Sequence, residues 1–360
     1  MIYFSNPKYS FIKNKKEILK NISNVIDKGQ YIKGENCEKF EKSFKKFLNC
    51  KFVVGTGNAT DSLLLSIRAL GLKSGDEIIT TSLTATATGI SILNSGVKPK
   101  FVDICKKSFC IDLKSLENKI NKKTKAIIIV HLYGQSCNMD YLKKICKKHN
   151  LYLIEDCAQS AGGFFKNKRL GTFGDLGCFS FFPTKNLSCL GDGGAIVTNN
   201  KKLFEKVKSM SQYGWDKNRD AIYLGMNSRL DEIQSAILNL KLKNLNKDNI
   251  ERKKIAKNYF KSIKNSKILL PENVKGSNHV YHLFVIKTKR RNLLLKKMKK
   301  NDIVCGIHYK LPLHKQKIFK KYKSYLKNTD QISKEIVSIP IYPGLTKKEQ
   351  LKVINVLNDF

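Results

Sequence analysis

A lysine, an aspartate and a serine occur at spacings that could support chemistry on an amine. Lys185 follows an aromatic segment and precedes the Gly-rich segment 191–194, while Asp156 lies 29 residues and Ser180 five residues upstream of it. Burial lowers the pKa of a lysine, and a neutral amine can form a Schiff base with an aldehyde. Taken alone, this segment is equally consistent with a solvated turn lysine.

Polar residues at the ends of predicted strands have two interpretations each. Asp156 ends an apolar run, where a carboxylate needs a cation or a hydrogen-bond donor. A protonated pyridine nitrogen would meet that need, and so would a neighbouring Arg or Lys. Ser180 could bind phosphate or be an ordinary strand serine. Asn227 could be a polar ligand beside a helix start or a turn residue before Ser228.

The turn at 57–61 reads Gly-Asn-Ala-Thr-Asp and precedes a predicted helix. A helix N-terminus can hold phosphate, and Thr60 adds a hydroxyl donor. By itself, however, the turn is more typical of an ordinary capped helix. It has neither the Gly-Lys-Ser/Thr of a P-loop nor three spaced glycines of a dinucleotide site. The segment 191–194 leads into a strand and is predicted to be a hairpin turn.

The elements that would position these residues alternate between strands and helices through the first two thirds of the chain. This alternation predicts an α/β fold, with a mostly parallel sheet and helices on both faces. Ligands bind such sheets outside the carboxyl ends of the strands, where Thr60, Asp61, Asp156 and Lys185 fall. We expect strands at 51–55, 77–81, 100–104, 126–131 and 151–155, and helices after 61, at 86–94 and at 139–148.

The pattern changes after Asn227. Ser228 is predicted to cap a long helix that continues to about Lys264. Its inward face would carry Leu230, Ile233, Ile237 and Leu240. We expect a large domain at 1–245, including the N-terminal segment, and a smaller α+β domain at 246–360.

Composition narrows the class of protein. The 360 residues include 68 Lys and Arg and 29 Asp and Glu, a net charge of +39. The excess is nearly all Lys, accompanied by abundant Asn and Ile, which indicates a codon bias more than a nucleic-acid surface. Ten cysteines without a Cys-x-x-Cys pair predict reduced thiols in a cytoplasmic protein. Neither a membrane span, zinc-type ligand spacing nor a Gly-x-Ser-x-Gly motif is present, so we expect no membrane, metal or nucleic-acid partner.

Together, these segments resemble the DegT/DnrJ/EryC1/StrS family of pyridoxal 5'-phosphate (PLP)-dependent sugar aminotransferases. The resemblance extends over nearly the whole chain, and its most specific part is 183–186 with 191–194. It implies the aspartate-aminotransferase-like fold of PLP-dependent transferases. Its motifs lie at 29–34, 57–63, 75–79, 99–103, 131–134, 154–159, 173–180, 183–186, 191–194, 227–234 and 307–309, with His314.

The resemblance also implies roles for individual residues. Lys185 is similar to the lysine that binds PLP covalently and then shuttles a proton. Asp156 matches the carboxylate that pairs with the pyridine nitrogen, and Gln159 the residue on the hydroxyl side of the ring. The phosphate ligands would be Ala59, Thr60 and Ser180. Asn227 would reach the phosphate of the other subunit's cofactor, which implies a homodimer with shared active sites.

The implied reaction transfers an amino group from glutamate to a nucleotide-linked keto sugar in amino-sugar biosynthesis, such as that of O-antigen polysaccharide. The resemblance favours C3 of a dTDP-3-keto-6-deoxyhexose, with C4 as the alternative position. Candidate substrate contacts are His308, Tyr309 and His314.

Two residues depart from the family pattern, since Ala85 stands where many relatives have an aromatic and Ala59 where glycine is usual. A dehydratase would have histidine at Lys185. The other functions that remain open are a keto-inositol aminotransferase, a catalytically silent PLP-binding regulator and a nucleic-acid binder.

Overall fold

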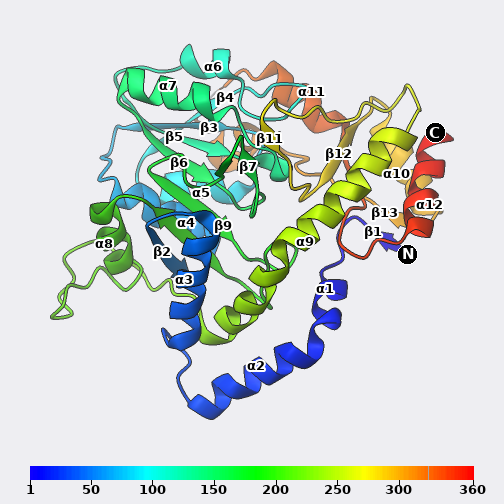
Figure 1. Cartoon of the computed structure of the whole chain (residues 1–360). Helices are drawn as coiled ribbons and strands as arrows, with labels where there is room; N and C mark the ends of the chain where they lie inside the picture. The colour runs from blue at the N-terminus through cyan, green and yellow to red at the C-terminus, as the bar shows by residue number, and fades with distance from the viewer. Residues whose placement is uncertain (323) are drawn as a thin grey trace.

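The computed structural model describes residues 1–322 and 324–360 and centres on a seven-stranded sheet (Figure 1). The strand order is β2-β10-β9-β6-β5-β3-β4, and all neighbours are parallel except β10, which is antiparallel to β2 and β9. The predicted mostly parallel α/β sheet is therefore confirmed. The strands are β2 (Phe52–Thr56), β3 (Glu77–Thr81), β4 (Lys98–Val102), β5 (Thr124–Val130), β6 (Tyr152–Asp156), β9 (Leu176–Ser180) and β10 (Gly194–Thr198).

Helices cover both faces of this sheet, which explains why its central strands are apolar on both sides. In β5, Ile127 and Ile129 pack into one hydrophobic cluster, while Ala126 and Ile128 pack into another. The first cluster is completed by helices α3 (Glu35–Leu48), α7 (Met139–His149) and α9 (Glu232–Ser262). The second is completed by α4 (Ala59–Ala69), α5 (Thr86–Asn94) and α8 (Lys201–Met210).

Helix α4 begins at Ala59, within the segment 57–61 that was predicted to be a turn before the helix. The side chain of Asn58 accepts a hydrogen bond from the Asp61 amide and caps the helix. The predicted capping role of Ser228 is wrong, because α9 begins at Glu232 after Asp231. The Ser228 hydroxyl instead accepts from the Gly57 amide at 3.0 Å and donates to the Asp61 carboxylate at 2.7 Å. Ser228 thus ties the segment before α9 to the start of α4.

The connection between β9 and β10 contains Lys185. These strands pair antiparallel, with Gly194 opposite Ser180. The hairpin turn predicted at 191–194 is wrong, because the whole segment 181–193 forms the connection. Its base is closed by bonds from the Phe181 amide to the Gly193 carbonyl and from the Cys189 amide to the Phe181 carbonyl.

The C-terminal part of the chain packs at the far end of α9 (Figure 1). There, β12 (Phe284–Lys287) pairs antiparallel with β14 (Ile336–Ile339), and β1 (Ile2–Tyr3) pairs parallel with β13 (Ile303–Val304). The predicted boundary at 245/246 falls inside the continuous helix α9, and Ile2 lies in the C-terminal hydrophobic cluster. The division into two domains therefore remains a prediction from the sequence.

No helix in the described ranges is long and apolar enough to cross a bilayer. All ten cysteines are free thiols, and Cys157 and Cys178 are buried. The elements not yet described are α1 (Pro7–Lys13), α2 (Lys15–Lys28), α6 (Leu113–Glu117), α10 (Arg291–Lys300), α11 (Lys327–Glu335), α12 (Lys347–Asn358), β7 (Phe164–Phe165), β8 (Lys168–Arg169) and β11 (Ser277–Asn278), with 3-10 turns at Leu132–Gly134, Leu313–Lys315 and Lys317–Phe319.

Candidate active site

A cavity of about 300 Å³ lies beyond the carboxyl ends of β6 and β9. It brings together four residues singled out by sequence: Gln159, Lys185, His308 and Tyr309. These residues come from the loop after β6, the β9–β10 connection and the segment after β13. Sequence reasoning missed the rest of the lining, which is Phe4, Ser5, Phe182, Thr184, His282 and Leu283.

The amine of Lys185 is set up for deprotonation. Burial lowers its pKa to about 8, while the nearby Asp156 carboxylate acts in the opposite direction. At that pKa, about a tenth of the amines are neutral at pH 7, compared with fewer than about one in a thousand for an exposed lysine. The next residue, Asn186, fixes the loop by donating to Asn249 Oδ1 at 2.7 Å and to the Val280 carbonyl at 3.1 Å.

Asp156 is buried at the end of β6, and burial raises the pKa of its carboxyl. Two donors and a cation oppose that rise. The Ala158 amide donates to Oδ1 at 3.1 Å, Thr88 Oγ1 donates to Oδ2 at 2.9 Å, and Lys185 contributes its positive charge. Asp156 and Lys185 therefore interact electrostatically at one edge of the sheet.

Helix α5 joins this carboxylate to the proposed phosphate site. Thr88 bonds Asp156, and one turn later Ser91 Oγ donates to the Thr60 carbonyl at 2.9 Å. Thr60 and Ala59 form the first turn of α4. The sequence predicted this helix, but not that Thr88 contacts Asp156. The spacing of Thr88 and Ser91 on one helical face was the available signal.

Replacing Thr88 with valine is expected to slow, about tenfold near neutral pH, the amino transfer that the family resemblance implies. The carboxylate of Asp156 would lose a hydrogen bond to its charged form, which raises its pKa further. The acid limb of the pH–rate profile should move to higher pH, and the two rates should converge in alkali. Thr88→Ser is expected to restore the wild-type profile, and Thr86→Val, an exposed change on the same helix, to leave it unaltered. An unchanged acid limb in Thr88→Val would contradict this positioning role.

Gln159, Tyr309 and His308 form the polar wall of the cavity. Gln159 accepts from the Tyr133 amide at 2.7 Å and donates to Tyr309 Oη at 3.0 Å. Burial, aided by Asp156, raises the pKa of Tyr309 to about 12. Burial and the Lys185 charge lower the pKa of His308 to about 4, so its ring is neutral at pH 7. His308 Nδ1 is hydrogen-bonded to Ser338 Oγ at 2.9 Å.

The other six predicted site residues lie outside this cavity lining: Ala59, Thr60, Asp156, Ser180, Asn227 and His314. His314 bonds Ser82 Oγ through Nδ1 at 2.6 Å and Asp330 through Nε2 at 3.0 Å, so both ring nitrogens already have protein partners. Thr60 lies at the start of α4, and Ser180 ends β9. Asn227 is exposed to solvent beside the tethered Ser228.

His282 was missed because its only sequence signal was a second histidine three residues upstream. Its ring lines the cavity, and its Nδ1 lies 3.2 Å from Asn186 Oδ1. Burial, followed by the charge on Lys185, lowers its pKa well below the usual value. A neutral imidazole therefore supports the loop that carries Lys185.

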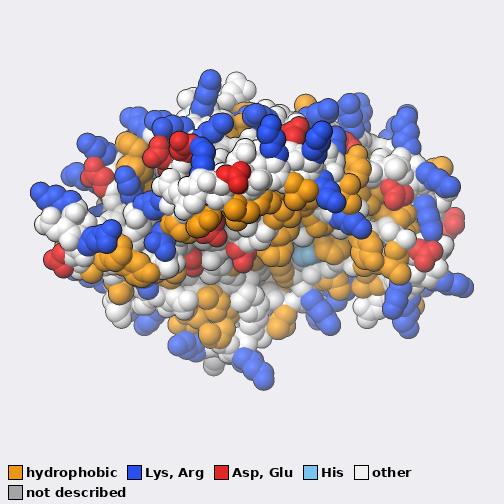
Figure 2. All heavy atoms as spheres, turned by 90° about the horizontal axis from the view of Figure 1, so that it is seen from below, with side chains coloured by type: hydrophobic (Ala, Val, Ile, Leu, Met, Phe, Trp, Pro, Cys, Tyr) orange, Lys and Arg blue, Asp and Glu red, His pale blue; other side chains and the backbone are white. Residues whose placement is uncertain are grey.

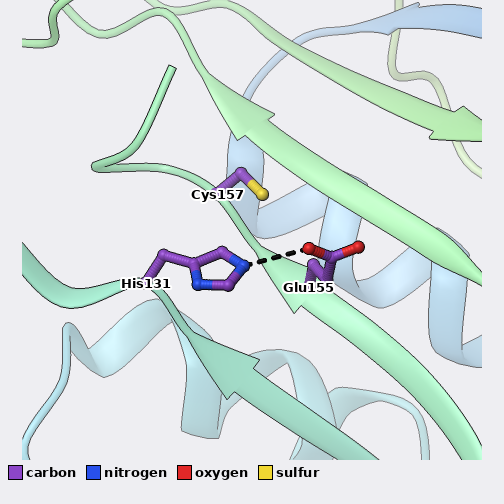
Figure 3. A group of neighbouring side chains, drawn as sticks. All are labelled: His131, Glu155 and Cys157. Carbon is purple, nitrogen blue, oxygen red and sulfur yellow. Dashed lines mark hydrogen bonds and ion pairs between the residues drawn. The ribbon is translucent and has the colours of Figure 1, made fainter. Parts of the chain in front are cut away.

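The buried side chains of His131, Glu155 and Cys157 lie together (Figure 3), and the last two flank Asp156 in the sequence. The Glu155 carboxylate already accepts bonds from His131 Nε2 and from the amides of Gly171, Phe173 and Gly174. A metal ion would have to displace these donors. The arrangement fits a structural anchor that holds the segment before β9, and we assign it no metal.

Glu155→Gln is expected to lower the free energy of unfolding by about 2 to 3 kcal/mol. The neutral amide accepts fewer hydrogen bonds than the carboxylate and leaves a buried backbone N–H unpaired. Denaturant titration measures the change. Glu205→Gln, at an exposed site on α8, should stay within about 0.5 kcal/mol of wild type. Equal stabilities for the two variants would rule out the anchoring role.

The mostly parallel sheet, with a buried lysine in a cavity at its carboxyl edge and a strand-end aspartate that interacts with that lysine electrostatically, fits an aminotransferase. The family model of the DegT/DnrJ/EryC1/StrS aminotransferase family matches residues 13–358. The chain belongs to this family and is an aminotransferase, and the sequence-based expectation of family, fold and enzyme class is confirmed.

Relatives of known activity and structure match over nearly the full length. The chain is 40% identical to the dTDP-3-amino-3,6-dideoxy-alpha-D-galactopyranose transaminase of Aneurinibacillus thermoaerophilus, covering 100% of this chain and 99% of the relative. The crystal structure of DesV from S. venezuelae in complex with a ketimine intermediate superposes with a TM-score of 0.97 at 31% identity, covering 99% and 98% of the two chains. The structure of NtdA from Bacillus subtilis with bound cofactor PMP gives 0.89 at 32% identity, covering 96% and 81%.

Proposed function

We propose that this enzyme uses PLP to transfer the amino group of glutamate to C3 of a dTDP-linked 3-keto-6-deoxyhexose. The observation that carries the proposal is the buried amine of Lys185, which lines the cavity and interacts electrostatically with the buried carboxylate of Asp156. The 40% identity to a dTDP-3-amino-3,6-dideoxyhexose transaminase supports the choice of sugar.

The residues present fit PLP. When bound, PLP supplies an aldehyde and an electron-accepting ring that carry the amino group between donor and acceptor. Lys185 would hold the aldehyde carbon, and Asp156 would keep the ring nitrogen protonated. The first turn of α4 offers unpaired N–H groups and the Thr60 hydroxyl for the phosphate, and Ser180 at the end of β9 is the third candidate phosphate ligand.

Proton transfer falls to this chain's own lysine. With its pKa lowered to about 8, the Lys185 amine can take a proton from the substrate carbon that carries nitrogen and return it. Gln159 and Tyr309 are held by their mutual hydrogen bond and would orient the bound groups. His308 stays neutral beside the lysine, so it can accept or donate a hydrogen bond without adding charge.

A second copy of the chain would complete the site. Asn227 is exposed, and the exposed side chains of Tyr31, Ile32 and Leu190 lie near the start of α9. Figure 2 shows a hydrophobic belt on the face seen from below, beside a hollow that contains a histidine. We infer that a homodimer forms through exposed hydrophobic side chains such as these. It would bring Asn227 toward the phosphate of the PLP bound by the other subunit.

The test is amination of defined sugars by the purified enzyme with glutamate and PLP. We expect turnover of dTDP-3-keto-6-deoxyhexose, with nitrogen at C3 by NMR of the product. The 4-keto isomer and the UDP-linked 3-keto sugars serve as comparisons. The preparation is expected to be a dimer by light scattering. Amination at C4, or a preference for a UDP-linked acceptor, would overturn the assignment of the substrate.

A further inference from the structure

The N-terminal segment crosses the cavity that contains Lys185. Its first part is fixed by β1, which pairs with β13, and by a bond from the Ile341 amide to the Phe4 carbonyl at 3.2 Å. Helix α1 then begins at Pro7, and α2 packs along α9 through Ile18, Ile237 and Leu240. Residues 4–6 are therefore held at both ends, between the C-terminal part of the chain and α9 (Figure 1).

This crossing segment borders the lysine loop on two sides. Phe4 and Ser5 line the 300 Å³ cavity together with Thr184 and Lys185. Ser5, Asn6 and Pro7 line a second, small cavity with residues 183–186. The chain's first residues thus form part of the wall around the reacting amine.

Phe4 supplies apolar surface to this cavity, as Phe182 and Leu283 also do. Its ring centroid lies 5.1 Å from that of His308, at an interplanar angle of 55°. Leu283 also lines this cavity and belongs to the hydrophobic cluster against which Phe4 packs. Aromatic and aliphatic surface of this kind binds apolar parts of a ligand and disfavours a hydroxyl that finds no partner.

We propose that Phe4 is a specificity-determining residue that packs against an apolar part of the acceptor sugar, the methyl group of a 6-deoxyhexose. This inference rests on the proposed function and adds to it the residue that recognises the deoxy position. A sugar with a hydroxyl at C6 would place that oxygen against Phe4 and Leu283. Phe4 has no part in the proton transfer, so its effect falls on recognition of the acceptor.

Kinetics of Phe4→Ala with two acceptors test the proposal. The KM for dTDP-3-keto-6-deoxyhexose should rise about tenfold, in the range set by loss of apolar contact in a pocket, while kcat changes less than about threefold. The preference for the 6-deoxy sugar over its 6-hydroxy counterpart should fall by a similar factor. The half-reaction with glutamate alone should proceed at the wild-type rate.

Two further variants separate recognition from folding. Phe4→Leu keeps an apolar side chain and should recover most of the affinity and preference. Tyr3→Ala removes the adjacent aromatic, which is 47% exposed and lies outside the cavity lining, and should behave as wild type. Calorimetry with a dTDP-6-deoxyhexose gives an independent affinity, expected to weaken about tenfold in Phe4→Ala.

The outcomes distinguish the two levels of the account. A wild-type enzyme that aminates neither sugar overturns the proposed function. A wild-type enzyme that aminates the 6-deoxy sugar, with Phe4→Ala keeping the same KM, preference and affinity, overturns the role of Phe4 alone. Equal losses in Tyr3→Ala and Phe4→Ala would show a structural effect and also contradict it.

Discussion

Lys185→Ala is expected to reduce amino transfer by about 10⁴-fold or more and to abolish the absorbance band of lysine-bound PLP. The variant removes the amine that we propose binds the aldehyde and moves the proton. Lys185→Arg should be similarly inactive, because a guanidinium stays protonated where a lysine with a pKa of about 8 does not. Single-turnover kinetics with glutamate and the visible absorbance of the protein measure the two losses.

The matched control is Lys147→Ala, which removes an exposed lysine of α7. Its rate and colour should equal those of wild type. Activity in Lys185→Ala within tenfold of wild type would show that another group performs the proton transfer. Retention of the absorbance band of lysine-bound PLP would show that PLP is attached to a different lysine.

Asp156→Asn is expected to slow amino transfer about 10³-fold while the protein still binds PLP. Asparagine fits the same volume, and its Oδ1 can accept from the Ala158 amide while its Nδ2 donates to the Thr88 hydroxyl, but it has no charge to keep a pyridine nitrogen protonated. Because burial raises the pKa of the Asp156 carboxyl, the wild-type rate should fall as pH drops through that pKa. The variant should lack this acid limb, which a pH–rate profile will show.

Asp140→Asn changes a carboxylate of α7 that is about half exposed and should leave the profile intact. If Asp156→Asn kept both the wild-type rate and its acid limb, the pairing of this carboxylate with the cofactor ring would be incorrect. A variant that lost PLP altogether would instead assign Asp156 to binding.

Local patterns were sufficient to predict the sheet and several of its helices. Apolar runs such as 126–130 form strands because both faces of the sheet are covered, and α5 spans the predicted 86–94. Asn58 caps α4 through a bond to Asp61, three residues away, so its effect is visible in a short window of sequence. Elements governed by neighbours in sequence were therefore predicted well.

Features that depend on distant segments were not predicted. Ser228 does not cap α9, and its hydroxyl is instead hydrogen-bonded to Gly57 and Asp61, more than 160 residues away. Phe4 reaches the cavity because β1 pairs with β13, some 300 residues later. Such long-range contacts leave no periodic pattern in the sequence. The positions of Ser228 and Phe4 were therefore found only in the folded structure.

The most direct test of the account is to identify the residue that binds PLP. Borohydride treatment of the PLP-loaded protein makes a lysine–cofactor bond permanent, and peptide mass mapping then locates it. We predict a single modified site, Lys185. The modification should be lost when glutamate is added before the reductant, because the amino group of glutamate displaces Lys185 from the cofactor. Modification of another lysine, or none, would contradict the claim that the buried amine beside Asp156 is the reacting group.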